Sequence, residues 1–256
     1  MNERLRVILK KTSFLWHKAK SLVFPPTCAF CQAPIEEYHA LCAQCWLSLK
    51  FINRNVCRIC GEAITDKTSE KYNANTSTQC CAQCTGFVTN KRPTDVISFI
   101  VYDDFSKQFL LRFKEKNDTS LALVFAQFFN KQDFDDIDLI VPVPLHPLRL
   151  WQRTYNQSAL LAMGLRHWAP DVPEIGFNSL CRMRYTPKQK KKGVEDRQKN
   201  IQKSMYVPYA SRPKIFGKRI AVIDDVVASG ATLAECKRAL EAAGAREVCC
   251  FALAQS

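Results

Sequence analysis

The region after residue 94 alternates between short apolar runs and segments with helical spacing. The apolar runs are typical of buried strands and lie at residues 96–102, 137–143, 219–223 and 247–253. The segments with helical spacing lie at residues 107–116, 121–130, 156–168 and 233–243. A strand–helix–strand unit whose helix stops at a glycine, as at Gly244, predicts parallel strands. We therefore expect an α/β fold with a parallel sheet.

The segments before residue 94, and residues 177–210, differ from this α/β pattern in composition. Residues 1–24 are basic, carry apolar residues at roughly helical spacing and end at a Pro-Pro pair, which predicts a basic N-terminal helix. Residues 25–90 are rich in cysteine and contain a small, polar stretch expected to be a loop. Within the α/β domain, assigned to residues 94–256, the polar and basic residues 177–210 predict a mobile excursion.

Composition and charge narrow the class of protein. With 256 residues, 47% hydrophobic and 24% charged, the chain is long enough for a proper core and typical of a globular protein. No apolar run approaches the ~18 residues of a membrane span, and no secretory signal is recognisable. A mitochondrial-type targeting segment is less firmly excluded. The net charge of +13 is concentrated in residues 1–24 and 182–203, which favours phosphate-rich partners over a merely solvated surface.

Eight of the 13 cysteines form four CxxC pairs: Cys28/Cys31, Cys42/Cys45, Cys57/Cys60 and Cys81/Cys84. Two residues between the thiolates let one tight turn place both sulfurs on the same ion, and two such turns complete a tetrahedral zinc site. The simplest arrangement joins the first pair to the second and the third to the fourth, although a crossed arrangement stays open. We predict two structural zinc sites; thiol redox chemistry is the weaker alternative.

The clearest candidate site follows the predicted strand at residues 219–223. Asp224 and Asp225 come at its carboxyl end, where open α/β sheets bind ligands. Small residues then lead into a helix whose free N–H groups can hold an anion, and the spacing of Thr232 and Glu235 predicts a capping box. Two carboxylates beside a phosphate cradle suit a sugar diol and a hydrated Mg²⁺. The alternative is an ordinary strand–helix turn with solvated carboxylates.

The stretch VIDDVVASGAT, residues 222–232, resembles the phosphoribosyl-pyrophosphate (PRPP) motif of type I phosphoribosyltransferases. The resemblance implies that Asp224 and Asp225 hold the ribose hydroxyls in a Mg²⁺-dependent complex. It also implies that the following loop holds the 5′-phosphate through Ala228, Ser229, Gly230, Ala231 and Thr232.

Two further stretches are similar to the ComF family of competence proteins: VPVPLHPLRLWQRTYNQSALLA (141–162) and CRMRYTPKQKKKGVEDRQKNIQ (181–202). The CxxC pairs match that family's double zinc ribbon. The resemblance implies a type I phosphoribosyltransferase-like parallel sheet with helices on both faces, preceded by the zinc-ribbon region. It also implies a cytoplasmic protein of DNA uptake in natural transformation, with single-stranded DNA and other competence proteins as partners. Thr154 and Tyr155 depart from the family's glycine and phenylalanine, and a glycine there would permit a positive φ.

The resemblance also suggests roles for basic residues. Arg149 and Arg153 follow the strand at 137–143, where type I enzymes bind pyrophosphate, and we expect Arg153 to act with the acidic pair in catalysis. Arg182 and Arg197 belong to the basic excursion and are expected to contact phosphate as it closes over the site. His146 and Asn156 are expected to be structural. Phosphoribosyl transfer and ligand binding without catalysis both stay open, as does a non-catalytic, single-stranded-DNA-binding accessory role.

Overall fold

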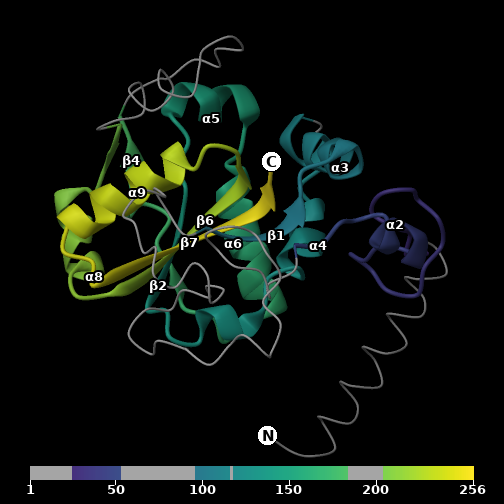
Figure 1. Ribbon diagram of the computed structural model, residues 1–256, viewed down its shortest axis with the longest axis horizontal. Helices are drawn as coiled ribbons and strands as arrows, with labels where there is room; N and C mark the ends of the chain where they lie inside the picture. The colour runs from purple at the N-terminus through teal and green to yellow at the C-terminus, as the bar shows by residue number, and fades with distance from the viewer. Residues whose placement is uncertain (1–24, 53–95, 116–117, 184–203) are drawn as a thin grey trace, which may run out of the picture.

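The computed structural model describes residues 25–52, 96–115, 118–183 and 204–256 (Figure 1). Their centre is a five-stranded sheet in the order β1-β7-β6-β2-β3, and every neighbouring pair is parallel. The strands are β1 (Val96–Val101), β2 (Leu139–Pro142), β3 (Glu174–Ile175), β6 (Arg219–Val227) and β7 (Glu247–Gln255). The predicted parallel sheet is confirmed.

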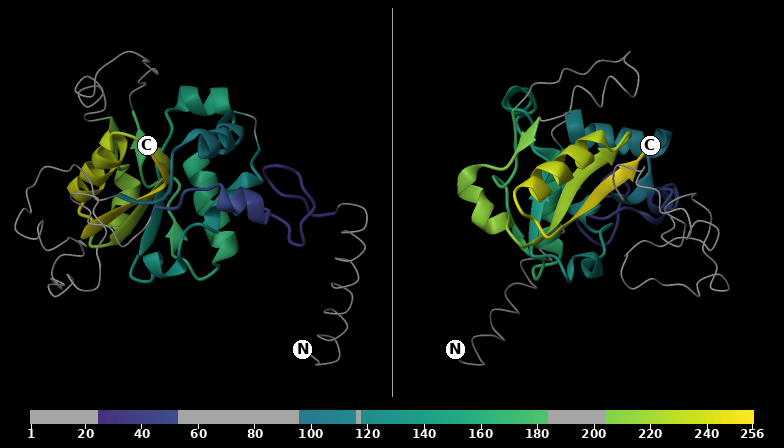
Figure 2. Two further views of the ribbon diagram at one scale, coloured as in Figure 1. Left: turned by 45° about the vertical axis from the view of Figure 1, so that its right-hand side comes forward. Right: turned by 60° about the vertical axis from the view of Figure 1, so that its left-hand side comes forward.

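Helices cover both faces of this sheet because its central strands are apolar on both sides. Along β6, Ile220 and Val222 pack with α8 (Arg212–Ile215) and α9 (Ala231–Ala242). The alternate residues Ala221 and Ile223 belong to the opposite core. That core contains α3 (Asp104–Glu115), α4 (Leu121–Ala126) and α6 (Gln157–Trp168). Figure 2 shows yellow α9 and the green-teal helices on opposite sides of the sheet.

Several smaller elements complete the α/β domain. Helix α5 (Pro147–Arg153) follows β2, and a two-stranded antiparallel sheet pairs β4 (Cys181–Arg182) with β5 (Met205–Tyr206). Two 3₁₀ helices, η2 (Lys131–Phe134) and η3 (Tyr209–Ser211), complete the described elements of this domain. The described ends of the predicted excursion at 177–210 are therefore ordered by strand pairing, and residues 184–203 lie outside the description.

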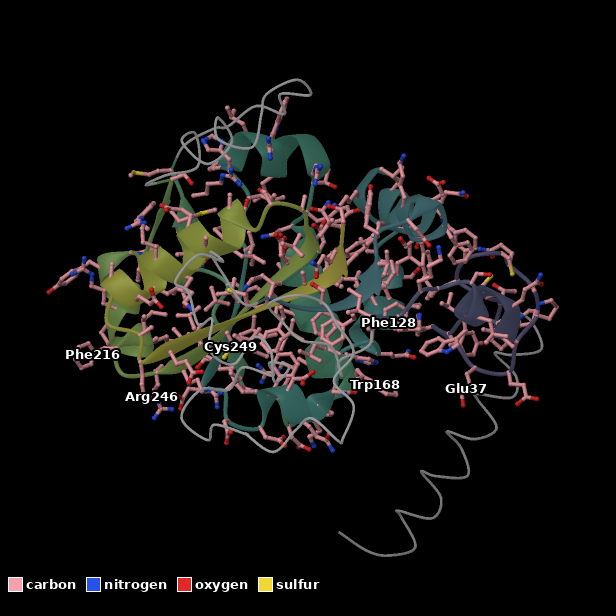
Figure 3. All side chains as sticks on the ribbon, in the orientation of Figure 1. Glu37, Phe128, Trp168, Phe216, Arg246 and Cys249 are labelled. Carbon is pink, nitrogen blue, oxygen red and sulfur yellow. The ribbon has the colours of Figure 1, made fainter. Side chains whose placement is uncertain are left out.

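The cysteine region packs directly on the α/β domain. Ile52 donates its backbone N–H to Phe99 O at 2.8 Å, so this segment pairs with the edge strand β1. The ring of Phe30 lies 4.6 Å from that of Phe105. Phe128, labelled in Figure 3, makes an edge contact with Trp46 of α2 (Ala43–Leu47). The cysteine region thus shares its core with α3 and α4. The predicted boundary at 90–94 and the N-terminal segment 1–24 lie outside the described residues.

The strands and helices agree with the sequence prediction to within a few residues, with instructive exceptions. Strand β6 continues past the predicted end at Ile223 because Asp224 and Val226 still pair with Ala252 and Ala254 of β7. Helix α9 begins at Ala231 rather than at Leu233. Among the described residues, no helix combines the length and the apolar character that crossing a membrane requires.

Candidate functional site

Two adjacent carboxylates lie at the carboxyl end of β6, the central strand between β7 and β2. Asp224 Oδ1 accepts hydrogen bonds from the hydroxyl of Ser158 at 3.0 Å and from the backbone N–H of Asp225 at 2.9 Å. Asp225 Oδ2 lies 3.1 Å from Nζ of Lys114, and the Asp225 side chain is only 13% exposed. The acidic pair is therefore held by residues from two helices, which argues against a pair of freely solvated carboxylates.

The acidic pair is electrostatically unusual. Burial raises the pKa of Asp224 to about 7, and the neighbouring charge of Asp225 adds to this shift. The Asp225 N–H, Lys114 and Ser158 oppose the shift without cancelling it. Near neutral pH, Asp224 therefore exchanges a proton easily, as is common for carboxyl groups in functional sites.

The loop after the acidic pair leads into the first turn of α9. Gly230 is the N-cap residue with φ of 70°, a left-handed conformation that favours glycine. The first backbone N–H groups of a helix have no partner within the helix, so this turn presents donors at the same edge as the acidic pair. The five predicted loop residues 228–232 thus surround a helix start suited to an anion.

The predicted capping box at Thr232 and Glu235 is wrong. Because α9 begins at Ala231, Thr232 already lies in the first turn. Glu235 points into the protein instead: its side chain is 6% exposed and accepts from Arg238 Nη2 at 2.7 Å. It also accepts the backbone N–H of Met205 at 3.5 Å.

Arg182 on β4 is influenced by two charged residues of other elements. Burial lowers the pKa of Arg182, and the positive charge of Arg149 on α5 lowers it further, whereas the negative charge of Asp224 raises it. Arg153 donates from Nη1 to Gln157 Oε1 at 3.2 Å, so its guanidinium is held by the start of α6. Arg197 lies outside the described residues.

The turn between α5 and α6 has the conformation that a glycine would favour. Thr154 has φ of 65° and ψ of −20°, which is rare for a β-branched residue. Its neighbour Tyr155 donates its hydroxyl proton to the carbonyl of Phe113 at the end of α3. Thr154 therefore keeps the left-handed turn, and Tyr155 adds a bond that a phenylalanine cannot make.

His146 and Asn156 have the structural roles expected of them. His146 is the N-cap of α5, and its Nδ1 accepts the backbone N–H of Leu148 at 3.2 Å. Asn156 Oδ1 accepts from the Ser158 N–H at 3.0 Å, while its Nδ2 donates to Val143 O at 2.9 Å. Asn156 thus caps α6 and fixes it to the end of β2, which places Ser158 beside the acidic pair.

The described cysteine pairs form one compact cluster. The Sγ atoms of Cys28, Cys31, Cys42 and Cys45 all lie within 4.8 Å of one another. In a tetrahedral zinc site with Zn–S bonds of ~2.3 Å, the sulfurs are about 3.8 Å apart, so the four thiols fit the metal. The simplest predicted arrangement, first pair with second, is the one observed. The ligands predicted for a second site, Cys57, Cys60, Cys81 and Cys84, lie outside the described residues.

Backbone donors prepare this cluster for an ion. The N–H of Cys42 lies 3.3 Å from Cys28 Sγ. Although burial opposes ionisation, N–H groups of Cys31, Cys42 and Phe30 lower the pKa of Cys28 to about 6. Burial and the neighbouring cysteines raise the pKa of Cys45. A cation that binds all four sulfurs would relieve this repulsion between thiolates.

Two contact residues of the acidic pair, Lys114 and Ser158, were not predicted from the sequence. Lys114 belongs to a short run of charged residues that resembles any exposed helix end. Ser158 stands 66 residues before Asp224, within a predicted helix. No local motif marks either residue, because their roles arise from the packing of α3 and α6 against the edge of the sheet.

Comparison with known proteins agrees with this geometry. A double zinc ribbon domain model matches residues 19–85. Competence protein F of Haemophilus influenzae is 34% identical over 119 residues, 46% of this chain and 51% of that protein. Competence protein ComFC of Bacillus subtilis is 28% identical over 225 residues, 84% of each chain. The DNA utilization protein YhgH of Escherichia coli K12 is 32% identical over 43% of this chain and 46% of its own. The match to the Haemophilus and Escherichia proteins thus spans about half of their length.

Similar solved structures include a hypoxanthine phosphoribosyltransferase from Trypanosoma cruzi, with a TM-score of 0.33 and 14% identity over 56% of this chain and 66% of its own. Another is an allosteric regulatory enzyme of purine biosynthesis, with a TM-score of 0.32 and 21% identity over 52% of this chain and 24% of its own.

The chain combines a zinc-ribbon cysteine cluster with a parallel sheet that has helices on both faces. Its motifs, the double zinc ribbon match and its similarity to the competence proteins F and ComFC support the resemblance to the ComF family.

Proposed function

We propose that this protein binds PRPP, or a related sugar phosphate, with Mg²⁺ at the carboxyl end of β6, and that it acts in DNA uptake in the cytoplasm. The observation that carries the proposal is the juxtaposition of a partly buried acidic pair with the left-handed Gly230 that opens α9. The names of the competence-protein relatives support the cellular role. Other competence proteins are the proposed partners.

In the proposed complex, the acidic pair accepts hydrogen bonds from the ribose hydroxyls. Ser158 and Lys114 each hold one oxygen of the pair, so the carboxylates are oriented before a ligand arrives. The amides of residues 228–232 hold the 5′-phosphate. A hydrated Mg²⁺, which binds through carboxylates and phosphates, would neutralise charge on the pyrophosphate group.

Transfer chemistry would break the bond between C1′ and a pyrophosphate oxygen while a nucleophile bonds to C1′. Negative charge then develops on the leaving pyrophosphate, and we propose that Arg149 and Arg182 stabilise it, since the charges of both Arg149 and Asp224 influence Arg182. We propose that Arg153 supports these contacts from the last turn of α5, and that Arg197 joins them from the basic segment.

A non-catalytic role in binding single-stranded DNA is the second candidate, and one observation favours it. Trp151 is 83% exposed on α5, the same short helix that carries Arg149 and Arg153, and Leu148 beside it is 53% exposed. Exposed aromatic rings next to arginines are the usual platform on which unpaired bases stack. Both roles are compatible, since Trp151 and Leu148 are not among the residues proposed to contact the sugar phosphate.

The zinc-ribbon region is proposed to hold two structural zinc ions. The first binds to the described cluster of Cys28, Cys31, Cys42 and Cys45. The second is assigned to Cys57, Cys60, Cys81 and Cys84, which the double zinc ribbon match also covers. Complete four-thiolate sites leave no open position for substrate, so neither ion takes part in chemistry.

Calorimetric titration of the zinc-loaded protein with PRPP and Mg²⁺ tests the sugar-phosphate site. We expect saturable binding by the wild type and its loss in Asp224→Asn/Asp225→Asn. The matched control is Asp135→Asn/Asp136→Asn, a second adjacent acidic pair that is exposed on the surface. This control should bind like the wild type. A folded wild type that fails to bind would contradict the proposal and leave single-stranded DNA as the ligand to test.

A further inference from the structure

Lys114 approaches the acidic pair from a helix that the proposed ligand contacts do not use. It lies near the end of α3, and its Nζ is 3.1 Å from Asp225 Oδ2. The lysine side chain is 21% exposed and the aspartate side chain 13%, so this ion pair is largely withdrawn from water. An ion pair exposed to solvent is usually weak and mobile. A partly buried ion pair is screened less by solvent and holds its geometry better.

The end of α3 is fixed on both sides, so Lys114 has a defined place. Phe113, the preceding residue, is fully buried and its ring makes an edge contact with that of Phe125 at 5.4 Å. The carbonyl of Phe113 accepts the hydroxyl proton of Tyr155 from the turn before α6. The backbone that carries Lys114 is thus anchored to the core and to the neighbouring turn.

Together, the contacts orient both carboxylates. Asp224 Oδ1 is held by Ser158 and by the Asp225 N–H, and Asp225 Oδ2 is held by Lys114. Asp224 Oδ2 and Asp225 Oδ1 are then the oxygens that a ligand can use. Two carboxylates on adjacent residues, each with one oxygen in use, match a ligand with two neighbouring hydroxyl groups.

We propose that Lys114 is a specificity-determining residue that fixes Asp225 for a vicinal diol and so makes the site select ribose phosphates over 2-deoxyribose phosphates. This inference rests on the proposed sugar-phosphate function. A 2-deoxyribose lacks one of the two hydroxyls, so one fixed, largely buried carboxylate oxygen would lose its donor, which is costly. Without Lys114, the Asp225 side chain can turn towards water, and the missing hydroxyl costs less.

The selectivity has a consequence for a protein of DNA uptake. Degradation of incoming DNA yields deoxyribose phosphates, which carry the same 5′-phosphate as ribose ligands. A site that recognised phosphate alone would bind both. A diol-selective site keeps its ligand distinct from the products of DNA breakdown.

The test compares the affinities of ribose 5-phosphate and 2-deoxyribose 5-phosphate by calorimetry. The proteins are the full-length wild type, Lys114→Met and Lys114→Arg. Lys107→Met serves as the control, because Lys107 is an exposed lysine on the same helix. We expect the wild type and the control to prefer the ribose ligand by roughly tenfold or more. Lys114→Met should bind both ligands with similar affinity, and Lys114→Arg should keep part of the preference.

Each outcome has a distinct meaning. If Lys114→Met keeps the wild-type preference while its affinity for both ligands falls equally, Lys114 is only structural and the inference fails. If the wild type binds both sugars equally, the diol selectivity itself is absent. If the wild type binds neither ligand, the proposed sugar-phosphate function fails first. Thermal unfolding of each variant verifies that lost binding does not reflect lost folding.

Discussion

Oε1 of Glu235 accepts the backbone N–H of Met205 at 3.5 Å and so ties α9 to β5. Met205 is paired with Arg182 in the two-stranded sheet, and Glu235 is itself held by Arg238 at 2.7 Å. Helix α9, which begins next to Gly230, is thereby linked to the strand that pairs with β4, and β4 carries Arg182. The residue that the sequence pattern assigned to a helix cap instead positions a neighbouring sheet.

Glu235→Gln should loosen this link. The substitution keeps the shape of a buried side chain but removes the charge that pairs with Arg238, so we expect a loss of about 1–3 kcal/mol in the free energy of unfolding. Hydrogen exchange should become faster at the Met205 amide. Glu241→Gln, on the exposed face of the same helix, is the control and should leave that amide unchanged. Unchanged protection of Met205 in Glu235→Gln would refute the link.

Thr154→Gly should stabilise the protein. Thr154 adopts φ of 65°, where a β-branched residue is strained and glycine is not, so relief of strain is expected to exceed the entropy that glycine adds to the unfolded chain. We expect a gain of about 1 kcal/mol, measured by denaturant unfolding. Thr119→Gly, at an exposed turn without a positive φ, should be neutral or destabilising. A loss of stability in Thr154→Gly would contradict this reading of the turn.

Asp224→Asn should stabilise the protein in a pH-dependent way. Because the pKa of Asp224 is raised to about 7 in the folded state, the folded protein binds this proton more tightly than the unfolded chain does. The resulting stability is full below the unfolded pKa of ~3.9 and is lost as the pH rises through about 7. At pH 8 the free energy of unfolding of the variant should therefore exceed that of the wild type by on the order of 1 kcal/mol or more, and the variant should melt at a higher temperature.

The difference between wild type and Asp224→Asn should shrink as the pH falls towards 4. Melting temperatures measured at several pH values from 4 to 8 (about one unit apart) give the comparison. If the variant is instead less stable than the wild type at pH 8, the ionised carboxylate of Asp224 stabilises the folded protein, which contradicts the prediction.

Zinc removal should destabilise more than the cysteine region. Phe30 lies between Cys28 and Cys31 in the sequence and packs on Phe105, while its carbonyl accepts from Arg112 Nη1 at 2.8 Å. A chelator that unfolds residues 25–52 would therefore expose part of the core of α3. We expect two zinc ions per wild-type chain and one in Cys45→Ala, measured by metal analysis. A wild type with one zinc would contradict the second site, and an unchanged content in Cys45→Ala would contradict the first.

The sequence predicted those strands, helices and site residues whose structure depends on neighbouring residues in the chain. Strand β2 and the first half of β6 are apolar runs because they are buried on both faces, and α6 begins directly after Asn156, whose side chain caps it. The site at the end of β6 was predicted because parallel strands direct their carboxyl ends to one edge. The combination of the first two CxxC motifs in one cluster was predicted as the simplest arrangement.

The parts that escaped prediction depend on contacts between distant segments. Helix α5 is short and leaves Leu148 and Trp151 exposed, so its sequence has no amphipathic pattern from which the helix could be predicted. Strands β4 and β5 have two residues each. The capping box failed because Glu235 finds Arg238 and Met205 within the fold, and a tertiary partner outweighs a local motif.

The structure of the complex with PRPP and Mg²⁺ tests the central claim most directly. We expect the 5′-phosphate to bind to the backbone amides of residues 228–232 and the ribose hydroxyls to bind to Asp224 and Asp225, with Lys114 still in contact with Asp225. A ligand bound elsewhere, for example on the exposed face of α5, or no ligand at saturating concentration in well-folded protein would contradict it.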